Sequence, residues 1–314
     1  MTVAGALMLG AALAAWTVPL LLRRLTRSVR DPTAAITWWL VSIVAVLATF
    51  AVGARLLLTP GDQPTGAVAD LAHTCWAVLR HGRLPELDEA VGAAGLAVLL
   101  LLLIRFTLAI TRRLRSQRRV HRAHINLIAV MGHAGLASPS VLWVDDQRMY
   151  AYSVDGRPGL VVASTGVRQL PRQQIEAVFC HERAHLRGRH HLLVVLAEAL
   201  AAALPWVPLF RHAPAAMRLH AEFAADAAAA RRHGSATVRA ALLALTGGNE
   251  PDHALGMAAT DIALRLNRID APTQRGRLHR TAGRAAAALT PALTPAVLGL
   301  GALAAALALT CPGS

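Results

Sequence analysis

The stretch from residue 169 to 191 reads QLPRQQIEAVFCHERAHLRGRHH, and it places two histidines four residues apart. Pro171 stands where a helix can begin, because proline fits the first helical position. Good helix formers follow it, so the stretch predicts a helix. On this helix His181 and His185 project from the same face, since residues four apart are neighbours on a helix surface.

This pair of histidines is the pattern from which a single metal ion can be held. Both imidazoles can reach one Zn²⁺ at about 2.0 to 2.1 Å. Glu182 follows the first histidine and lies beside the metal, where it can act as general base towards a water molecule. The HExxH pattern arises by chance on the order of a few per cent of the time in a chain of this kind, so its context must support it.

A catalytic zinc ion of this type needs a third protein ligand and one open position. Glu222, in HAEFAADAAAA, is the favoured candidate, with Asp226 one turn later as a supporting hydrogen-bond acceptor. His191 is the alternative, because the chain also satisfies HExxHxxGxxH with Gly188 at the turn position. The residues after His191, LLVVLAEAL, favour a helix, and on an unbroken helix His191 would point away from His181 and His185. With Glu222 as ligand, His190 and His191 are expected to be ordinary polar or interfacial residues.

The residues around this helix predict a small α+β unit. A helix is expected over 120–137, a short strand over 141–144 (VLWV), and a hairpin over 150–164 around the turn signal DGRPG. A later helix is expected over 214–232, beginning at a proline and ending at a glycine.

Outside this unit the chain is too apolar for an ordinary soluble domain. Hydrophobic residues make up 55% of it, charged residues 16%, and the mean hydropathy is +0.44. A membrane helix needs about 20 apolar residues. Four such spans are predicted, at 3–22, 34–58, 90–110 and 285–310, with a short tail to residue 314.

Arginine placement predicts how these spans are oriented. Arginines cluster after the first span, after the third and before the fourth, whereas the loop 59–89 holds few of them among several acids. Basic loops remain on the cytoplasmic side. We therefore expect a multi-pass protein of the cell membrane, with its amino terminus outside and a cytoplasmic domain over 111–284. We expect the net charge of +14 to reflect contacts with anionic lipid and the orientation of the spans, and not direct binding of nucleic acid.

One further apolar stretch, residues 192–210, is nearly long enough to cross a bilayer. It contains Glu198 and the helix breakers Pro205 and Pro208. A crossing here would separate the two halves of the predicted metal site, so a half-buried or reentrant hairpin is expected.

HERAH followed some forty residues later by EFAAD, between a third and a fourth membrane span, resembles the BlaR/MecR-type antirepressor metallopeptidases. These are relatives of the CAAX-protease and HtpX group. The resemblance implies a mostly α, polytopic helical membrane protein with a small α+β zincin-like metallopeptidase domain. It implies Zn²⁺ as the cofactor, with His181, His185 and Glu222 as its ligands. It also implies Glu182 as the general base and Asp226 as a residue that supports a ligand.

The same resemblance implies a substrate-binding edge strand over 159–165. Its backbone would hold an extended peptide by hydrogen bonds. The residues concerned are Gly159, Leu160, Val161, Val162 and Ala163.

In that family a large extracellular penicillin-binding domain follows the fourth helix, whereas four residues follow residue 310 here. We therefore expect any signal to arrive through the loop 59–89, the membrane or a separate sensor partner. The expected function is cleavage of a cytoplasmic protein, with a transcriptional repressor as the substrate implied by the resemblance. Two alternatives are a quality-control protease of HtpX type and a non-catalytic receptor with a structural zinc site.

A few polar residues have no assigned place in this scheme. His253 is a candidate donor to a developing oxyanion, with an ordinary loop histidine as the alternative. His220 is expected to be a surface or packing residue. Arg265 and Arg268 can clamp an acidic partner or can lie on a solvated or lipid-facing side.

Overall fold

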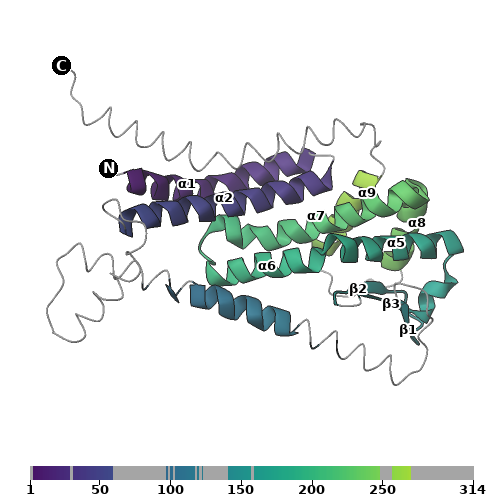
Figure 1. Cartoon of the computed structure of the whole chain (residues 1–314). Helices are drawn as coiled ribbons and strands as arrows, with labels where there is room; N and C mark the ends of the chain where they lie inside the picture. The colour runs from purple at the N-terminus through teal and green to yellow at the C-terminus, as the bar shows by residue number, and fades with distance from the viewer. Residues whose placement is uncertain are drawn as a thin grey trace, which may run out of the picture.

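The structure is a computed structural model that describes residues 3–28, 31–58, 97, 100, 101, 103–116, 119, 122, 141–156, 159–247 and 257–269. Within these residues the chain is mostly α-helical, with one small sheet at one end (Figure 1). The third predicted span is described only in part. The fourth span at 285–310, the loop 59–89, the helix predicted over 120–137 (apart from residue 122) and His253 lie outside the described residues.

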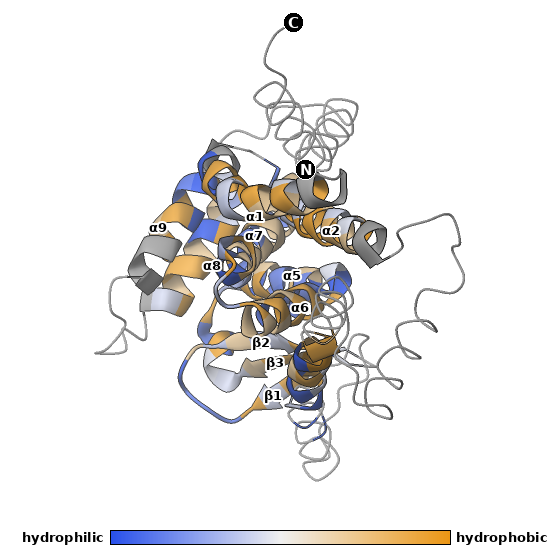
Figure 2. Ribbon diagram, turned by 90° about the vertical axis from the view of Figure 1, so that its left-hand side faces the viewer, coloured by the Kyte–Doolittle hydropathy of each residue, from blue (hydrophilic) through white to orange (hydrophobic). Residues whose placement is uncertain are grey.

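The two N-terminal helices, α1 (Val3–Ser28) and α2 (Pro32–Leu58), lie side by side (Figure 1). Hydrophobic residues predominate on both (Figure 2). Large apolar side chains such as Trp16, Leu20 and Val44 face outwards, each more than 60% exposed. By length and composition alone, Leu7–Arg24 and Pro32–Ala54 could cross a membrane, which is weak support for membrane association.

A helical hairpin follows the helix that carries HERAH. Helix α6 (His190–Ala203) turns at residues 204–207 into α7 (Pro208–His233). The predicted turn within 192–210 is therefore present, although its relation to a bilayer stays a prediction. The predicted start of the later helix at Pro214 is wrong, because Pro208 occupies the first turn, where a missing N–H costs nothing, and Pro214 lies inside the helix.

The first half of α7 packs against α1 and α2. Trp39 of α2 and Leu209, Ala213 and Met217 of α7 are almost completely buried in one hydrophobic cluster with residues of α1 and α6. This burial explains why Pro214 is tolerated inside the helix, since packing of an apolar face outweighs the loss of one backbone hydrogen bond. The cluster joins the N-terminal helices to the element that carries Glu222 and Asp226.

The sheet contains β1 (Val141–Val144), β2 (Ala151–Val154) and β3 (Leu160–Ser164), in the order β1-β3-β2. β2 and β3 are antiparallel, as the predicted hairpin requires, and β1 runs parallel to β3. Both the short strand and the hairpin are thereby confirmed.

The expectation that residues 159–163 form an edge strand is wrong, because β3 lies between β1 and β2. A strand with neighbours on both sides has no free backbone edge for a peptide. Its continuous apolar run is typical of a strand buried on both faces. The four residues of that range that lie in β3 are all buried: Leu160, Val161, Val162 and Ala163.

The helix that carries HERAH is α5 (Arg172–Gly188), and it does not continue into α6 as expected. Arg189 has φ 48° and ψ 39°, a left-handed conformation, and its N–H is bonded to the carbonyls of His185 and Leu186. This is a helix C-cap, with arginine in a conformation that usually favours glycine. The last helices described are α8 (Ser235–Gly247) and α9 (Met257–Ile269).

Candidate metal centre

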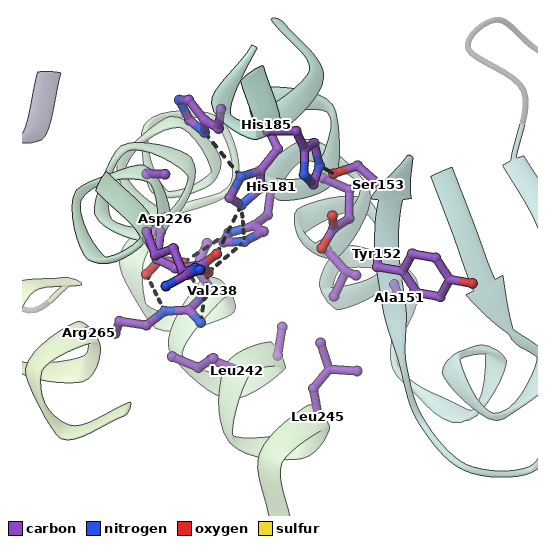
Figure 3. A pocket seen from close by; sticks show the side chains of 18 of the residues that line it. Ala151, Tyr152, Ser153, His181, His185, Asp226, Val238, Leu242, Leu245 and Arg265 are labelled. Atoms are coloured by element: carbon purple, nitrogen blue, oxygen red, sulfur yellow. Dashed lines mark hydrogen bonds and ion pairs between the residues drawn. The ribbon is translucent and has the colours of Figure 1, made fainter. Parts of the chain in front are cut away.

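Three side chains from two helices converge where α5 packs against α7. His181 and His185 of α5 and Glu222 of α7 offer ligand atoms that all lie within 4.8 Å of one another. The Nε2 atoms of the two histidines are 3.1 Å apart. Each lies 3.4 Å from an oxygen of the Glu222 carboxylate. The structure therefore brings together the three residues predicted from the sequence as ligands. The two histidines are seen side by side in Figure 3.

The outward nitrogens of both histidines are also engaged. Nδ1 of His181 lies 3.0 Å from Oδ1 of Asp226, and Nδ1 of His185 lies 3.1 Å from Nδ1 of His190. Hydrogen bonds at Nδ1 fix the ring orientation and leave Nε2 for a metal ion. Asp226 therefore lies where the supporting acceptor was predicted. His190 was missed as a partner, because its position depends on the helix break at Arg189.

Arg265 of α9 links the acidic residues of the site (Figure 3). Its Nε and Nη2 donate to the two oxygens of Asp226, each at 2.8 Å, and its Nη1 lies 3.0 Å from Glu222. The acidic partners foreseen for this arginine are therefore residues of the same chain. Arg268 lies with its guanidinium carbon 4.6 Å from the ring centroid of Phe223. No local sequence pattern indicates the Arg265 contacts, because α9 and α7 meet only in the tertiary fold.

The charges in the site are tightly coupled. Burial alone lowers the pKa of His181, but hydrogen bonds to Asp226 and Glu222 outweigh it and raise the pKa to about 9. Burial and the charge of His181 lower the pKa of His185 to about 3. Burial raises the pKa of Glu222, yet the hydrogen bond from His181 and the charge of Arg265 outweigh burial and lower this pKa to about 2. Without a metal ion, a protonated His181 thus lies between two carboxylates and a neutral His185.

Glu182 lies in the same cavity as the three candidate ligands and does not belong to their group. Burial raises the pKa of its carboxyl above the usual range, and this outweighs the lowering by the charge of His181 and by hydrogen bonds from Ser153. A carboxyl group with a raised pKa exchanges protons more readily near neutral pH. Its position beside the ligands is the one expected for a general base.

The cavity has a volume of about 660 Å³ and is closed on two sides by elements of different character. Ala151, Tyr152 and Ser153 of β2 form one wall (Figure 3). The other wall is apolar and comes from α8, whose contributing side chains include Val238, Leu242 and Leu245. A cavity of this volume can accommodate several side chains of an extended peptide.

β2 is an edge of the three-stranded sheet in the part of the chain that the structure describes. The Ser164 N–H donates to the Tyr150 carbonyl, so residues 150, 152 and 154 direct their backbone groups to β3. The N–H and C=O groups of Ala151 and Ser153 consequently point away from β3. Both residues line the cavity, so this edge faces the candidate site, where Ser153 also donates a backbone hydrogen bond to the Glu182 carboxylate.

The expectation that His190 and His191 are ordinary interfacial residues is wrong. Both line the cavity, because the break at Arg189 redirects the chain immediately after α5. Nε2 of His191 lies 3.1 Å from the Ser153 hydroxyl, and this histidine is not in the three-residue group that could hold a metal ion. The structure therefore places Glu222, and not the alternative His191, with the two HERAH histidines.

His220 points away from this group, as predicted. It is 3% exposed, and its ring lies 5.9 Å from that of Phe223. It is therefore a packing residue of α7.

Comparison with known proteins bears on the class of enzyme. No solved structure matches the chain. Residues 114–249, which include HERAH and Glu222, match Peptidase family M48, and this similarity supports a metallopeptidase of that family.

Proposed function

We propose that this chain is an integral-membrane, zinc-dependent endopeptidase that cleaves a cytoplasmic protein. The observation that carries the proposal is the convergence of His181, His185 and Glu222 in one cavity with Glu182. The similarity of residues 114–249 to Peptidase family M48 supports the reaction class. The two apolar N-terminal helices support the membrane location.

The donor set fits zinc. Two imidazole nitrogens and one carboxylate are the ligands of many catalytic zinc sites, which leave a fourth position open. Both Nε2 atoms point towards the same carboxylate, and both Nδ1 atoms already have partners. A bound zinc ion supplies Lewis acidity towards a peptide carbonyl and lowers the pKa of water. A structural site normally closes its shell with four protein ligands, whereas three converge here among the residues that the structure describes, which disfavours the non-catalytic receptor.

The residues of the chain then have separate tasks. Glu182 accepts a proton from the attacking water and passes it to the leaving amine. The edge strand β2 binds the extended peptide through the backbone groups of Ala151 and the carbonyl of Ser153, which point away from β3. The α8 wall, with Leu242 and Leu245, receives an apolar side chain next to the bond that is cut.

The proposed substrate is a regulatory protein such as a transcriptional repressor, in keeping with the likeness of HERAH and EFAAD to BlaR/MecR-type proteases. A quality-control protease of HtpX type would use the same residues. The two roles differ in the substrates, since a regulatory enzyme cuts one or few soluble proteins and a quality-control enzyme cuts many damaged membrane proteins.

A single substitution at the proposed base tests the reaction. Glu182→Gln keeps the ligands and removes the proton acceptor, so we expect full zinc content and a loss of proteolysis of about 10²- to 10⁴-fold. Glu176→Gln is the matched control, because Glu176 lies on the exposed side of the same helix and pairs with Arg172. Full-length protein in membranes is assayed by sequencing new amino termini in the proteome of the expressing cell. Unchanged cleavage in Glu182→Gln would exclude this mechanism.

A second pair of variants tests the third ligand. Glu222→Ala should lose both zinc and activity, whereas His191→Ala should retain zinc, as measured by metal analysis of the purified protein. Zinc loss in His191→Ala together with retention in Glu222→Ala would reverse the assignment.

A further inference from the structure

The side chain of His190 lies within hydrogen-bond distance of the side chain of His185, a candidate metal ligand. Its Nδ1 lies 3.1 Å from Nδ1 of His185, and the two rings are perpendicular with centroids 4.9 Å apart. His190 is 7% exposed. Burial in a low-dielectric environment strengthens a hydrogen bond of this kind and restricts the orientation of both rings.

The hydrogen bond complements the one on the other histidine. His181 directs Nε2 to Glu222 and Nδ1 to Asp226, and His185 directs Nε2 to Glu222 and Nδ1 to His190. Because Nδ1 of His185 must carry the proton when Nε2 binds a metal ion, Nδ1 of His190 is the acceptor. The two ligand rings are thus oriented by different partners, a carboxylate and an imidazole.

The backbone around His190 is built to allow this contact. Arg189 adopts a left-handed conformation that ends α5 and begins α6, which turns the next side chain back towards α5. Gly188 leaves room for the His190 ring, because a Cβ atom at position 188 would lie 2.3 Å from Nε2 and 2.6 Å from Cδ2 of that ring. Any side chain at position 188 would therefore force the ring to move.

We propose that His190 is a positioning residue for the metal ligand His185: its Nδ1 accepts the Nδ1–H hydrogen bond of His185 and holds Nε2 towards the metal position, with Gly188 providing the space. The proposal rests on the proposed zinc site. It assigns His190 no contact with the metal ion or the substrate.

The test measures zinc affinity of the full-length protein in detergent by competition with a chromophoric chelator. His190→Ala should weaken zinc binding by about 10- to 100-fold, the usual effect of removing a partner of a ligand histidine. His190→Asn should restore most of the affinity, because the Asn side-chain oxygen can take the place of Nδ1 as acceptor. His212→Ala, at a half-buried histidine of α7 outside the cavity, should leave the affinity unchanged.

The visible spectrum of the Co²⁺-substituted protein adds a readout that loss of stability alone would not move. His190→Ala should shift the ligand-field bands, because His185 changes its orientation, and His190→Asn should return them towards the parent spectrum. Equal affinities and spectra in all three proteins would overturn the proposal. Complete loss of metal in both His190 variants would also overturn it, since His190 would then act as a ligand.

Gly188→Ala separates the steric part of the proposal from helix stability. Alanine ordinarily stabilises a helix relative to glycine, yet here it should weaken zinc binding by displacing His190. In the His190→Ala background the same substitution should have little further effect, because no ring remains to be displaced. Additive losses would refute the role of Gly188. These affinities do not depend on proteolysis, so a protein that binds zinc without cutting peptides refutes the proposed function and leaves this test intact.

Discussion

Replacement of Arg265 by glutamine removes the cation that pairs with both carboxylates of the site. Arg265 donates two hydrogen bonds of 2.8 Å to Asp226 and lies 3.0 Å from Glu222, and its side chain is 17% exposed. The side chain of Asp226 is 5% exposed. In the metal-free protein this substitution leaves the Asp226 carboxylate with little solvent to compensate the lost charge.

The size of the effect follows from burial. Removal of one partner from a buried ion pair typically costs about 3 to 5 kcal/mol. Two features place Arg265→Gln at the low end of that range. The Glu222 side chain is 36% exposed, and His181 still pairs with Asp226 because its pKa is raised to about 9. We therefore expect the free energy of unfolding of the metal-free protein to fall by about 3 kcal/mol.

The measurement is equilibrium denaturation of the full-length protein in detergent with a chelator present. Arg172→Gln is the matched control, since Arg172 pairs with Glu176 at 3.0 Å but its side chain is 91% exposed. An exposed pair four residues apart on a helix contributes about 0.3 to 0.5 kcal/mol, so the control should lose no more than that. The double variant Arg265→Gln, Asp226→Asn should recover part of the loss, because one uncompensated charge is removed as well.

Equal and small losses in Arg265→Gln and Arg172→Gln would refute this reasoning. They would mean that water or another cation replaces the guanidinium, so that Arg265 does not neutralise the site in solution.

Three further outcomes follow from the structure. Zinc binding at pH 7 should release about one proton, because the raised pKa of His181 keeps its imidazole protonated without metal, and the zinc affinity should rise with pH up to about 9. Calorimetry in buffers of different ionisation enthalpy measures the proton release, and heats that do not depend on the buffer would contradict it. Met217→Ala should lower the free energy of unfolding by about 2 to 5 kcal/mol, because Met217 is 1% exposed between α7 and the N-terminal helices. Leu264→Ala, at a position 45% exposed, is its control and should change the free energy far less. Leu245→Ala should shift cleavage in a peptide library towards larger apolar side chains, because it widens the α8 wall of the cavity; an unchanged preference would place the substrate elsewhere.

Local pattern was sufficient for the residues of the metal site. HERAH places two imidazoles on one helical face whatever surrounds it, since spacing of four residues determines their direction. EFAAD does the same for Glu222 and Asp226, and the structure brings both faces together. The apolar runs of α1 and α2 and the hairpin of β2 and β3 were likewise predictable, because length and turn residues are local properties.

Position within the sheet was not predictable from the same kind of pattern. A short apolar strand has the same sequence pattern at the edge of a sheet and in its centre. Only the pairing of β1 with β3 makes β3 central and leaves β2 as the edge beside the cavity.

By itself, the sequence determined which side chains share a helical face: His181 with His185, and Glu222 with Asp226. Only the tertiary structure decided what surrounds them. The left-handed Arg189 brought His190 to His185, and the packing of α9 brought Arg265 to Asp226. The physical reason is that periodicity specifies direction within one element, whereas a backbone reversal or a contact between distant elements depends on the free energy of the whole packed chain.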